Sequence, residues 1–390
     1  MSSLRTPIKD TMLPWMGTAQ TNQSKISSYM LQHSSESKNN LNKNKVIKKQ
    51  KSFAPKKNKT PTKTDSSTLS AWYFEKNKRT NRLWDYINIT PKSNPPDKDP
   101  DPPWGAPHTS KSSTTMRIWY TNPCGIGIAY DIKSHSSFEF LRHHSKCDIV
   151  CLAETNVHWK RLSPKNTLFS RIKSKWQEFK YSTSHNRHES LGVNQRGGTC
   201  TFCVGQLIYR FLSKGSDKTG LGRWSWISVQ GKNQYETRIY TAYRPGKKPP
   251  STTSRLTTVY EQHDRYLRDR KIESEPRDHF DQCLVEELEE QISLGKNIIL
   301  AIDANDDLIN GSFQKIMSTI GLVNPFINDL YPPMPPTHHK GSKPISSIFC
   351  SKSIIVTRAG ILQKGVGVRG DHKNMFIDVD TESLIGNPLF

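Results

Sequence analysis

Short apolar runs of strand length recur along the chain from Met116 onward, and polar turns separate them. In chain order the runs are RIWY, DIVCLA, GGTCTFCV, WISV, RIYTAY, NIILAI, ISSIFC and MFIDV. Runs of four to eight such residues between polar segments are typical of buried strands. We therefore predict strands at these positions.

A helical period appears between several of these runs, most clearly from residue 276 to 295. Pro276 suits the first turn of a helix and Gly295 suits its end. Apolar residues recur every three or four positions on one face: Phe280, Cys283, Leu284, Leu288 and Ile292. Strands interspersed with helices over about 270 residues predict one α/β domain, residues 114–390.

Residues 1–113 have a different composition and sustain neither period. From Lys38 to Lys63 every charged residue is basic, and blocks of like charge stay solvated. We predict a disordered basic N-terminal region that ends in a Pro-rich linker. This region could act as a nuclear-import signal or bind along the phosphate backbone of a nucleic acid. The alternative is that it only keeps the protein in solution.

The overall charge narrows the class of partner. The chain has 390 residues, a formal net charge of +22 and 33% hydrophobic residues, with a pI of about 9.6. Such basicity favours DNA or another nucleic acid first, and an anionic membrane surface second.

The cellular compartment is indicated by the apolar runs, the N-terminus and the cysteines. No apolar run approaches the ~20 residues that span a bilayer, and the N-terminus lacks the apolar core of a secretory signal. Seven cysteines, an odd number, favour a reducing compartment. We expect a nuclear protein, cytoplasmic before import, neither secreted nor membrane-bound. Cys200 and Cys203 are interpreted as strand thiols, and Gln23–Met30 resembles a sliding-clamp-binding box.

Five predicted strand ends lead into residues that can carry chemistry, and ligands of α/β sheets bind beyond strand ends. The residues at these ends are Asn122, Glu154, Tyr243 with Arg244, Asp303 with Asn305, and Asp371 with His372. This set suits phosphodiester hydrolysis with Mg²⁺, or Mn²⁺, because hard cations prefer carboxylate oxygens. Glu154 could bind the metal, Asp303 the attacking water, and His372 the phosphate oxygens.

The order of short motifs resembles the endonuclease/exonuclease/phosphatase superfamily. These motifs are TNPCGI, CLAETN, RGGT, YRP, IDAN and GDH, and a late TH…GS.PI…IFCS segment is most similar to endonuclease domains of non-LTR retrotransposons. The resemblance implies a DNase I-like four-layer α/β sandwich, with two β-sheets flanked by helices. It also implies a Mg²⁺-dependent DNA endonuclease that leaves a 3′-hydroxyl nick. A reverse transcriptase, separate or in a missing downstream domain, is the implied partner.

The resemblance also assigns roles. Asp303 and Asn305 would serve the nucleophile, Tyr243 and His372 the scissile phosphate, and Asn122 both catalysis and the metal shell. Glu154 and Asp371 belong to the implied metal site. The remaining residues, implied to contact substrate, are Arg244, Arg196 and Thr337.

Ser346 departs from the family pattern, which places an Asp at this position, directly after Ile345, to orient the catalytic His. A serine brings no charge, so we expect His372 to hold a proton less readily and catalysis to weaken. Asp378 could replace the missing acid. The alternatives are an apurinic/apyrimidinic repair endonuclease, another phosphodiesterase or phosphatase of this superfamily, or a nucleic-acid-binding domain with weakened catalysis.

Three further features have simpler interpretations. His338 and His339 could bind metal, but adjacent loop histidines are more often exposed. The stretch from Arg244 to Arg277 is either a DNA-backbone loop or a mixed-charge solvated helix. Trp224 and Trp226 are interpreted as core residues rather than base-stacking ones.

Overall fold

The computed structural model describes residues 102–127, 132–188, 192–231, 235–247, 258–327 and 331–385, with only the backbone for 132–135. All of these residues belong to one compact unit, Pro91–Phe390. The basic run Lys38–Lys63 and the segment Gln23–Met30 lie outside the described residues. No helix within the described ranges is both long and apolar enough to cross a bilayer.

Two β-sheets form the centre of the domain. The seven-stranded sheet has the order β1-β12-β13-β2-β3-β5-β4: β1 Trp104–Gly105, β12 Val356–Ile361, β13 Met375–Asp380, β2 Thr115–Thr121, β3 Ile149–Leu152, β5 Thr199–Val204 and β4 Phe179–Ser184. The six-stranded sheet has the order β10-β11-β9-β8-β7-β6: β10 Leu322–Val323, β11 Ser346–Ser351, β9 Asn297–Asp303, β8 Glu236–Tyr243, β7 Trp224–Gln230 and β6 Phe211–Ser216. All eight predicted strands are present.

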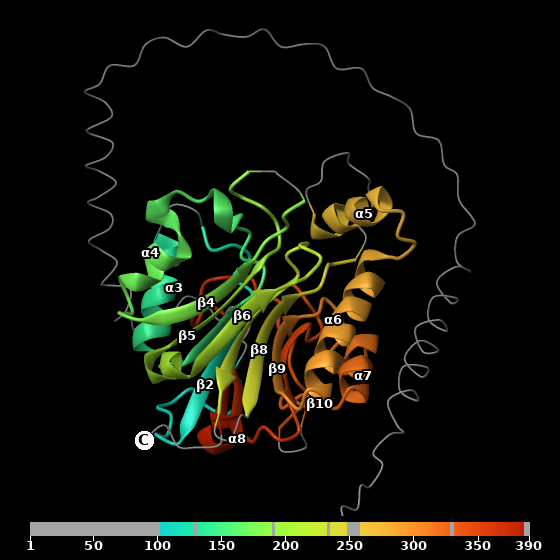
Figure 1. Cartoon of the computed structure of the whole chain (residues 1–390). Coiled ribbons are helices and arrows are strands. Elements are labelled where there is room, and N and C mark those ends of the chain that lie inside the picture. The colour runs from blue at the N-terminus through green and yellow to red at the C-terminus, as the bar shows by residue number, and fades with distance from the viewer. Residues whose placement is uncertain are drawn as a thin grey trace, which may run out of the picture. The chain divides into compact units, whose positions relative to one another are not determined.

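Apolar side chains from both sheets share one core. Ile118 and Ile149 of the first sheet pack in the same cluster as Ile239 and Ile299 of the second, and all four are fully buried. Figure 1 shows helices on both outer flanks, with α3 and α4 beside the first sheet and α6 and α7 beside the second. The expected two-sheet sandwich flanked by helices is therefore confirmed.

The helices follow from local sequence signals. The predicted helix is α6, Pro276–Ser293, with Pro276 in its first turn and the Glu275 side chain accepting bonds from two N-terminal amides. Gly295 follows with φ of 74°, the left-handed conformation that ends many helices. The other α-helices are α3 Ile132–His143, α4 Leu168–Lys173, α5 Val259–Asp269, α7 Ser312–Thr319 and α8 Thr381–Ile385.

The basic stretch after Arg244 contains α5 within its described part. On this helix Arg268 pairs with Asp264 at 3.2 Å and Arg265 approaches Asp269 at 3.7 Å, all on exposed side chains. Of the two interpretations left open, the structure favours the mixed-charge solvated helix for residues 259–269.

The structure also tests the interpretations of the tryptophan pair and of the cysteine pair. Trp224 is buried, as expected for the core, whereas Trp226 is only partly buried, with the Arg238 guanidinium 3.8 Å above its ring. Cys200 and Cys203 are buried on β5 with raised thiol pKa values, because burial disfavours the thiolate. They are strand thiols, as predicted.

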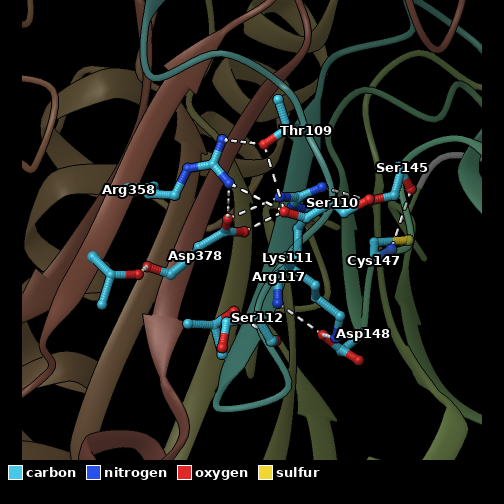
Figure 2. Close-up of polar contacts among 12 residues, drawn as sticks. Thr109, Ser110, Lys111, Ser112, Arg117, Ser145, Cys147, Asp148, Arg358 and Asp378 are labelled. Carbon is cyan, nitrogen blue, oxygen red and sulfur yellow. Dashed lines mark hydrogen bonds and ion pairs between the residues drawn. The ribbon is translucent and has the colours of Figure 1, made fainter.

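Asp378 is paired elsewhere. Its two carboxylate oxygens accept bonds of 2.7 and 2.8 Å from Nε and Nη2 of Arg117, and both residues are fully buried. Figure 2 shows this pair with Arg358 on its other side. The expectation that Asp378 could stand in for the acid missing at Ser346 is therefore wrong, since neither oxygen is available to His372.

The sheet topology places the candidate functional residues at one edge of the sandwich. β2 runs parallel to β3, and β8 runs parallel to β9, so their carboxyl ends lie at common edges. β13 is antiparallel to β2, and β11 is antiparallel to β9, with Ser346 opposite Asp303. The ends of four strands and the beginnings of two therefore supply the residues described next.

Candidate active site

Asn122 lies at the centre of the site. Its Nδ2 donates to Glu154 Oε2 at 3.0 Å and to Asp303 Oδ2 at 2.8 Å, and it lies 3.5 Å from His372 Nε2. Its Oδ1 accepts a bond from the Cys124 amide at 2.8 Å, which fixes the orientation of the side chain. The Asn122 amide thus joins Glu154 and Asp303, which lie 32 and 181 positions after it in the chain. Glu154 follows β3 of one sheet, and Asp303 ends β9 of the other.

Glu154 is held by a tightly turned backbone. Its φ is 44° and that of Asn156 is 56°, a region that residues other than glycine seldom adopt. The Asn156 side chain accepts a bond from the Gly197 amide at 2.8 Å. Gly197 has a φ of 85°, a conformation that favours glycine, and a Cβ there would meet Val259 Cγ2 at 2.9 Å. Strain of this kind concentrates at functional sites.

Asp303 and Asn305 form a rigid turn at the end of β9. Asp303 Oδ1 accepts the Asn305 amide at 3.1 Å, and the Asn305 side chain donates to the Arg244 carbonyl at 2.8 Å. Asn305 has a φ of 47°. The Asp-Ala-Asn sequence is therefore a fixed mount rather than a flexible surface loop.

Burial and like charge raise the pKa values of the acids. Burial raises the pKa of Asp303 to about 6, although the Asn122 amide opposes the shift. Burial also raises the pKa of Glu154, and the charges of Asp303 and Asp371 add to that increase. Tyr243 has a raised pKa for the same reasons: burial first, then the charges of Glu154 and Asp303.

His372 contacts the position that departs from the family pattern. Its Nδ1 lies 3.0 Å from Ser346 Oγ, and its Nε2 lies 3.5 Å from Asp303 Oδ2. Burial lowers the pKa of His372, while Asp371 and Glu154 act in the opposite direction. The imidazole is accordingly biased toward its neutral form.

The carboxylates suit a hard divalent cation. The charges of Asp303 and Asp371 add to the burial that raises the pKa of Glu154, and Asn122, the side-chain amide that donates to both Glu154 and Asp303, is uncharged. Asp371 Oδ1 is buried and accepts no bond from any nitrogen or oxygen of the described residues. An oxygen-rich cluster of this kind suits a hard divalent cation, and Glu154 and Asp371 are the carboxylates that could hold it.

Three residues expected to contact substrate lie in different settings. Arg196 is exposed on the turn before Gly197. Thr337 is fully buried, and its Oγ1 accepts the amides of Ile345 and Ser346 at 2.9 and 3.1 Å. Thr337 therefore organises the start of β11 through its hydroxyl.

Arg244 is also buried. Its Nε donates to Asp281 Oδ1 at 2.6 Å, its Nη2 pairs with the other oxygen, and its guanidinium lies 5.5 Å from the Phe313 ring centroid. With 3% of its surface exposed, its side chain braces α6 against the end of β8.

His338 belongs to the site although the sequence favoured an exposed loop position. Its ring centroid lies 5.0 Å from that of His372, with the planes at 68°. Two loops pair like short strands to bring His338 beside His372. The periodicity of the sequence gives no signal for such a pairing, so His338 could not be assigned to the site from the sequence.

The fold and this cluster together define the class of protein: a two-sheet α/β sandwich with a carboxylate, amide and imidazole site at one edge of its sheets, as the sequence resemblance implies. No family model matches the chain, and no curated protein matches it. Among solved structures, an AP endonuclease from Leishmania major is similar at 12% identity and a TM-score of 0.49, covering 69% of this chain and 88% of that one.

Two further structures have similar values. A 3′-5′ exonuclease from Neisseria meningitidis has 11% identity and a TM-score of 0.48, with 68% and 100% of the two chains covered. An endonuclease/exonuclease/phosphatase from Beutenbergia cavernae has 11% identity and a TM-score of 0.46, with 68% and 72% covered. Similarities at this level give no information about the substrate. The geometry of the site is therefore the basis for the function proposed below.

Proposed function

We propose that this protein is a Mg²⁺-dependent DNA endonuclease that hydrolyses one phosphodiester and leaves a 3′-hydroxyl nick. The observation that carries the proposal is the Asn122 amide, which joins Glu154 and Asp303 at 3.0 and 2.8 Å. Had these two acids lain apart, they could not act on one phosphate. Their convergence supports hydrolysis at a single centre.

The residues divide the work of an in-line displacement. Asp303, with a pKa of about 6, is ionised at neutral pH and accepts the proton of the attacking water. Asn305 holds Asp303 through its backbone amide. Tyr243, whose raised pKa keeps its hydroxyl protonated, and His372 offer donors to phosphate oxygens as their charge grows.

The cation belongs with Glu154 and Asp371. When bound there, Mg²⁺ would neutralise phosphate charge and favour departure of the 3′ oxygen. Nucleic acid as the substrate is supported by the net charge of +22.

A plasmid assay tests the proposal. Supercoiled plasmid is incubated with the protein in Mg²⁺ or chelator, beside Glu154→Gln and Asp303→Asn. We expect nicking in Mg²⁺ alone, and a loss of at least a hundredfold in both variants. Glu290→Gln, an exposed acid on α6, is the matched control and should nick as the native chain does. Nicking that survives both site substitutions would overturn the proposal.

One second candidate has an observation in its favour. Ser346 brings no charge to His372, which favours a domain that binds nucleic acid with weakened catalysis. Binding without nicking in every variant would support it. An oligonucleotide with one abasic site, compared with undamaged duplex, separates a repair endonuclease from the proposed enzyme.

The remaining parts of the proposal concern context. Retrotransposon type, a reverse transcriptase partner and nuclear residence rest on the motif resemblance and on the basic N-terminal region. Clamp binding through Gln23–Met30 rests on a short sequence match alone. A reporter fused to residues 1–113 that stays outside the nucleus would argue against the import role.

A further inference from the structure

His338 is held in place by a short antiparallel pairing of two loops. It bridges to His372, and the flanking bonds run from the His339 amide to the Asp371 carbonyl at 2.9 Å and from the Lys373 amide to the Thr337 carbonyl at 2.8 Å. The two imidazoles consequently lie on the same side of the pairing, with ring centroids 5.0 Å apart. The position of His338 beside the proposed phosphate site is therefore fixed by backbone bonds.

The position of its proton is fixed as well. The Lys340 amide donates to His338 Nδ1 at 3.2 Å, and the Gly341 amide closes the same turn on the His338 carbonyl at 3.0 Å. Because Nδ1 accepts a hydrogen bond, its lone pair is occupied and the ring proton resides on Nε2. Nε2 of His338 is thus a donor.

The Nε2 donor of His338 faces the carboxylate of Asp371 but makes no hydrogen bond to it. Nε2 lies 3.6 Å from Asp371 Oδ2, which is beyond ordinary hydrogen-bond length. His338, Asp371 and His372 do lie close enough to suggest a transition-metal site. However, a metal needs the lone pair of Nε2, and the Lys340 contact places a proton on that atom. The geometry therefore suits an oxygen acceptor better than a metal.

We propose that His338 is a further substrate-contacting residue, which donates from Nε2 to a non-bridging oxygen of the scissile phosphodiester beside His372. This inference rests on the proposed function and deepens it. It gives the site two imidazoles for one phosphate, where His372 Nδ1 contacts the neutral hydroxyl of Ser346 rather than a carboxylate.

Three substitutions separate a donor from a packing role. His338→Gln retains a nitrogen donor near the position of Nε2, His338→Asn places its amide near Nδ1 instead, and His338→Phe keeps the ring without a donor. We expect kcat/KM for plasmid nicking to fall about ten- to a hundredfold in Asn and Phe, and Gln to recover most of it. His339→Phe, the exposed neighbour, is the matched control and should be unchanged.

The opposite pattern overturns the inference: activity retained in Phe and lost in Gln would show that only ring packing matters. If the native chain does not nick DNA, equilibrium binding of a duplex oligonucleotide decides instead. Weaker binding by His338→Phe, with His339→Phe unaffected, would support phosphate contact even though the proposed hydrolysis had failed. Equal binding by all of these proteins would exclude it.

Discussion

Ser346 Oγ lies 3.0 Å from His372 Nδ1, so the imidazole is oriented by a neutral hydroxyl. The hydroxyl can position the ring as a carboxylate would, but it brings no negative charge to stabilise the imidazolium. Since burial already lowers the pKa of His372, the orientation of this histidine and its charge are uncoupled in this protein.

A carboxylate at position 346 should restore that coupling. In Ser346→Asp, the pKa of His372 should rise, because an anion within bonding distance favours the charged ring. Asp303 lies opposite Ser346 in the sheet, and the added charge should raise its pKa above the present value of about 6. Both limbs of the pH–rate profile should move to higher pH, and nicking near pH 8 should increase about tenfold.

Ser346→Asn is the control, because it has nearly the same shape as Asp without the charge. It should leave both limbs in place. An Asp variant whose pH–rate profile superimposes on that of the native chain would refute the electrostatic account of Ser346.

The strand ends of the site were predictable because parallel pairing aligns them. An apolar run that ends in Asp303 and another that ends in Tyr243 must bring these residues to the same edge, since β8 and β9 are parallel. The partner of Arg244 was not predictable: Asp281 lies on a helix 37 residues away, and only packing brings it there. The substrate contact expected of Arg244 remains a prediction.

Half-exposed strands escaped the hydrophobic pattern in a similar way. β4 and β6 contain Lys180 and Lys214 and face solvent along part of their length, so no continuous apolar run marks them. His338 was underestimated because its proximity to His372 depends on two loops pairing through backbone bonds. Such bonds are available to every residue type and leave no compositional signal.

Asp303→Asn should stabilise the fold at neutral pH while abolishing nicking. Burial raises the pKa of Asp303 to about 6 from 3.8. An acid with a raised folded pKa contributes most stability below about pH 4, and that contribution is lost as pH rises through 6. In chelator at pH 7.5 we expect the free energy of unfolding of Asp303→Asn to exceed that of the native chain by about 1–3 kcal/mol. This range follows because the pKa of Asp303 is raised by about two units on folding.

Urea titrations at several pH values measure this effect. The difference between the two proteins should shrink as pH falls from 7.5 toward 4. Asp378→Asn makes the same chemical change in the buried pair with Arg117 and should destabilise at neutral pH. A native chain that gains stability as pH rises from 5 to 7.5, relative to Asp303→Asn, would contradict the assigned shift.

Arg244→Met should act on stability rather than on DNA contact. The substitution leaves Asp281 buried without its partner, which typically costs about 3–5 kcal/mol. Arg244→Met combined with Asp281→Leu should be less destabilised than the sum of the two single variants, because the second change removes the unpaired charge. Chemical denaturation of all four proteins gives the coupling energy.

Salt dependence supplies the contrary outcome for Arg244. A residue that neutralises a DNA phosphate contributes about one unit to the slope of log affinity against log salt. For Arg244→Met we expect the native slope. Loss of about one unit, with little loss of stability, would return Arg244 to the substrate-binding role.

Mg²⁺ should raise the Tm of the native chain through Glu154 and Asp371. A ligand present at ten times its Kd stabilises by about 1.4 kcal/mol, equivalent to about 2–4 °C for a domain of this size. Glu154→Gln and Asp371→Asn should each lose most of that increase, because each removes a charged oxygen ligand from a cluster with few compensating cations. Scanning calorimetry with and without Mg²⁺ measures the shift, and Glu290→Gln on the exposed face of α6 should retain it. A full Tm increase in Glu154→Gln would place the cation elsewhere and remove the metal from the proposed chemistry.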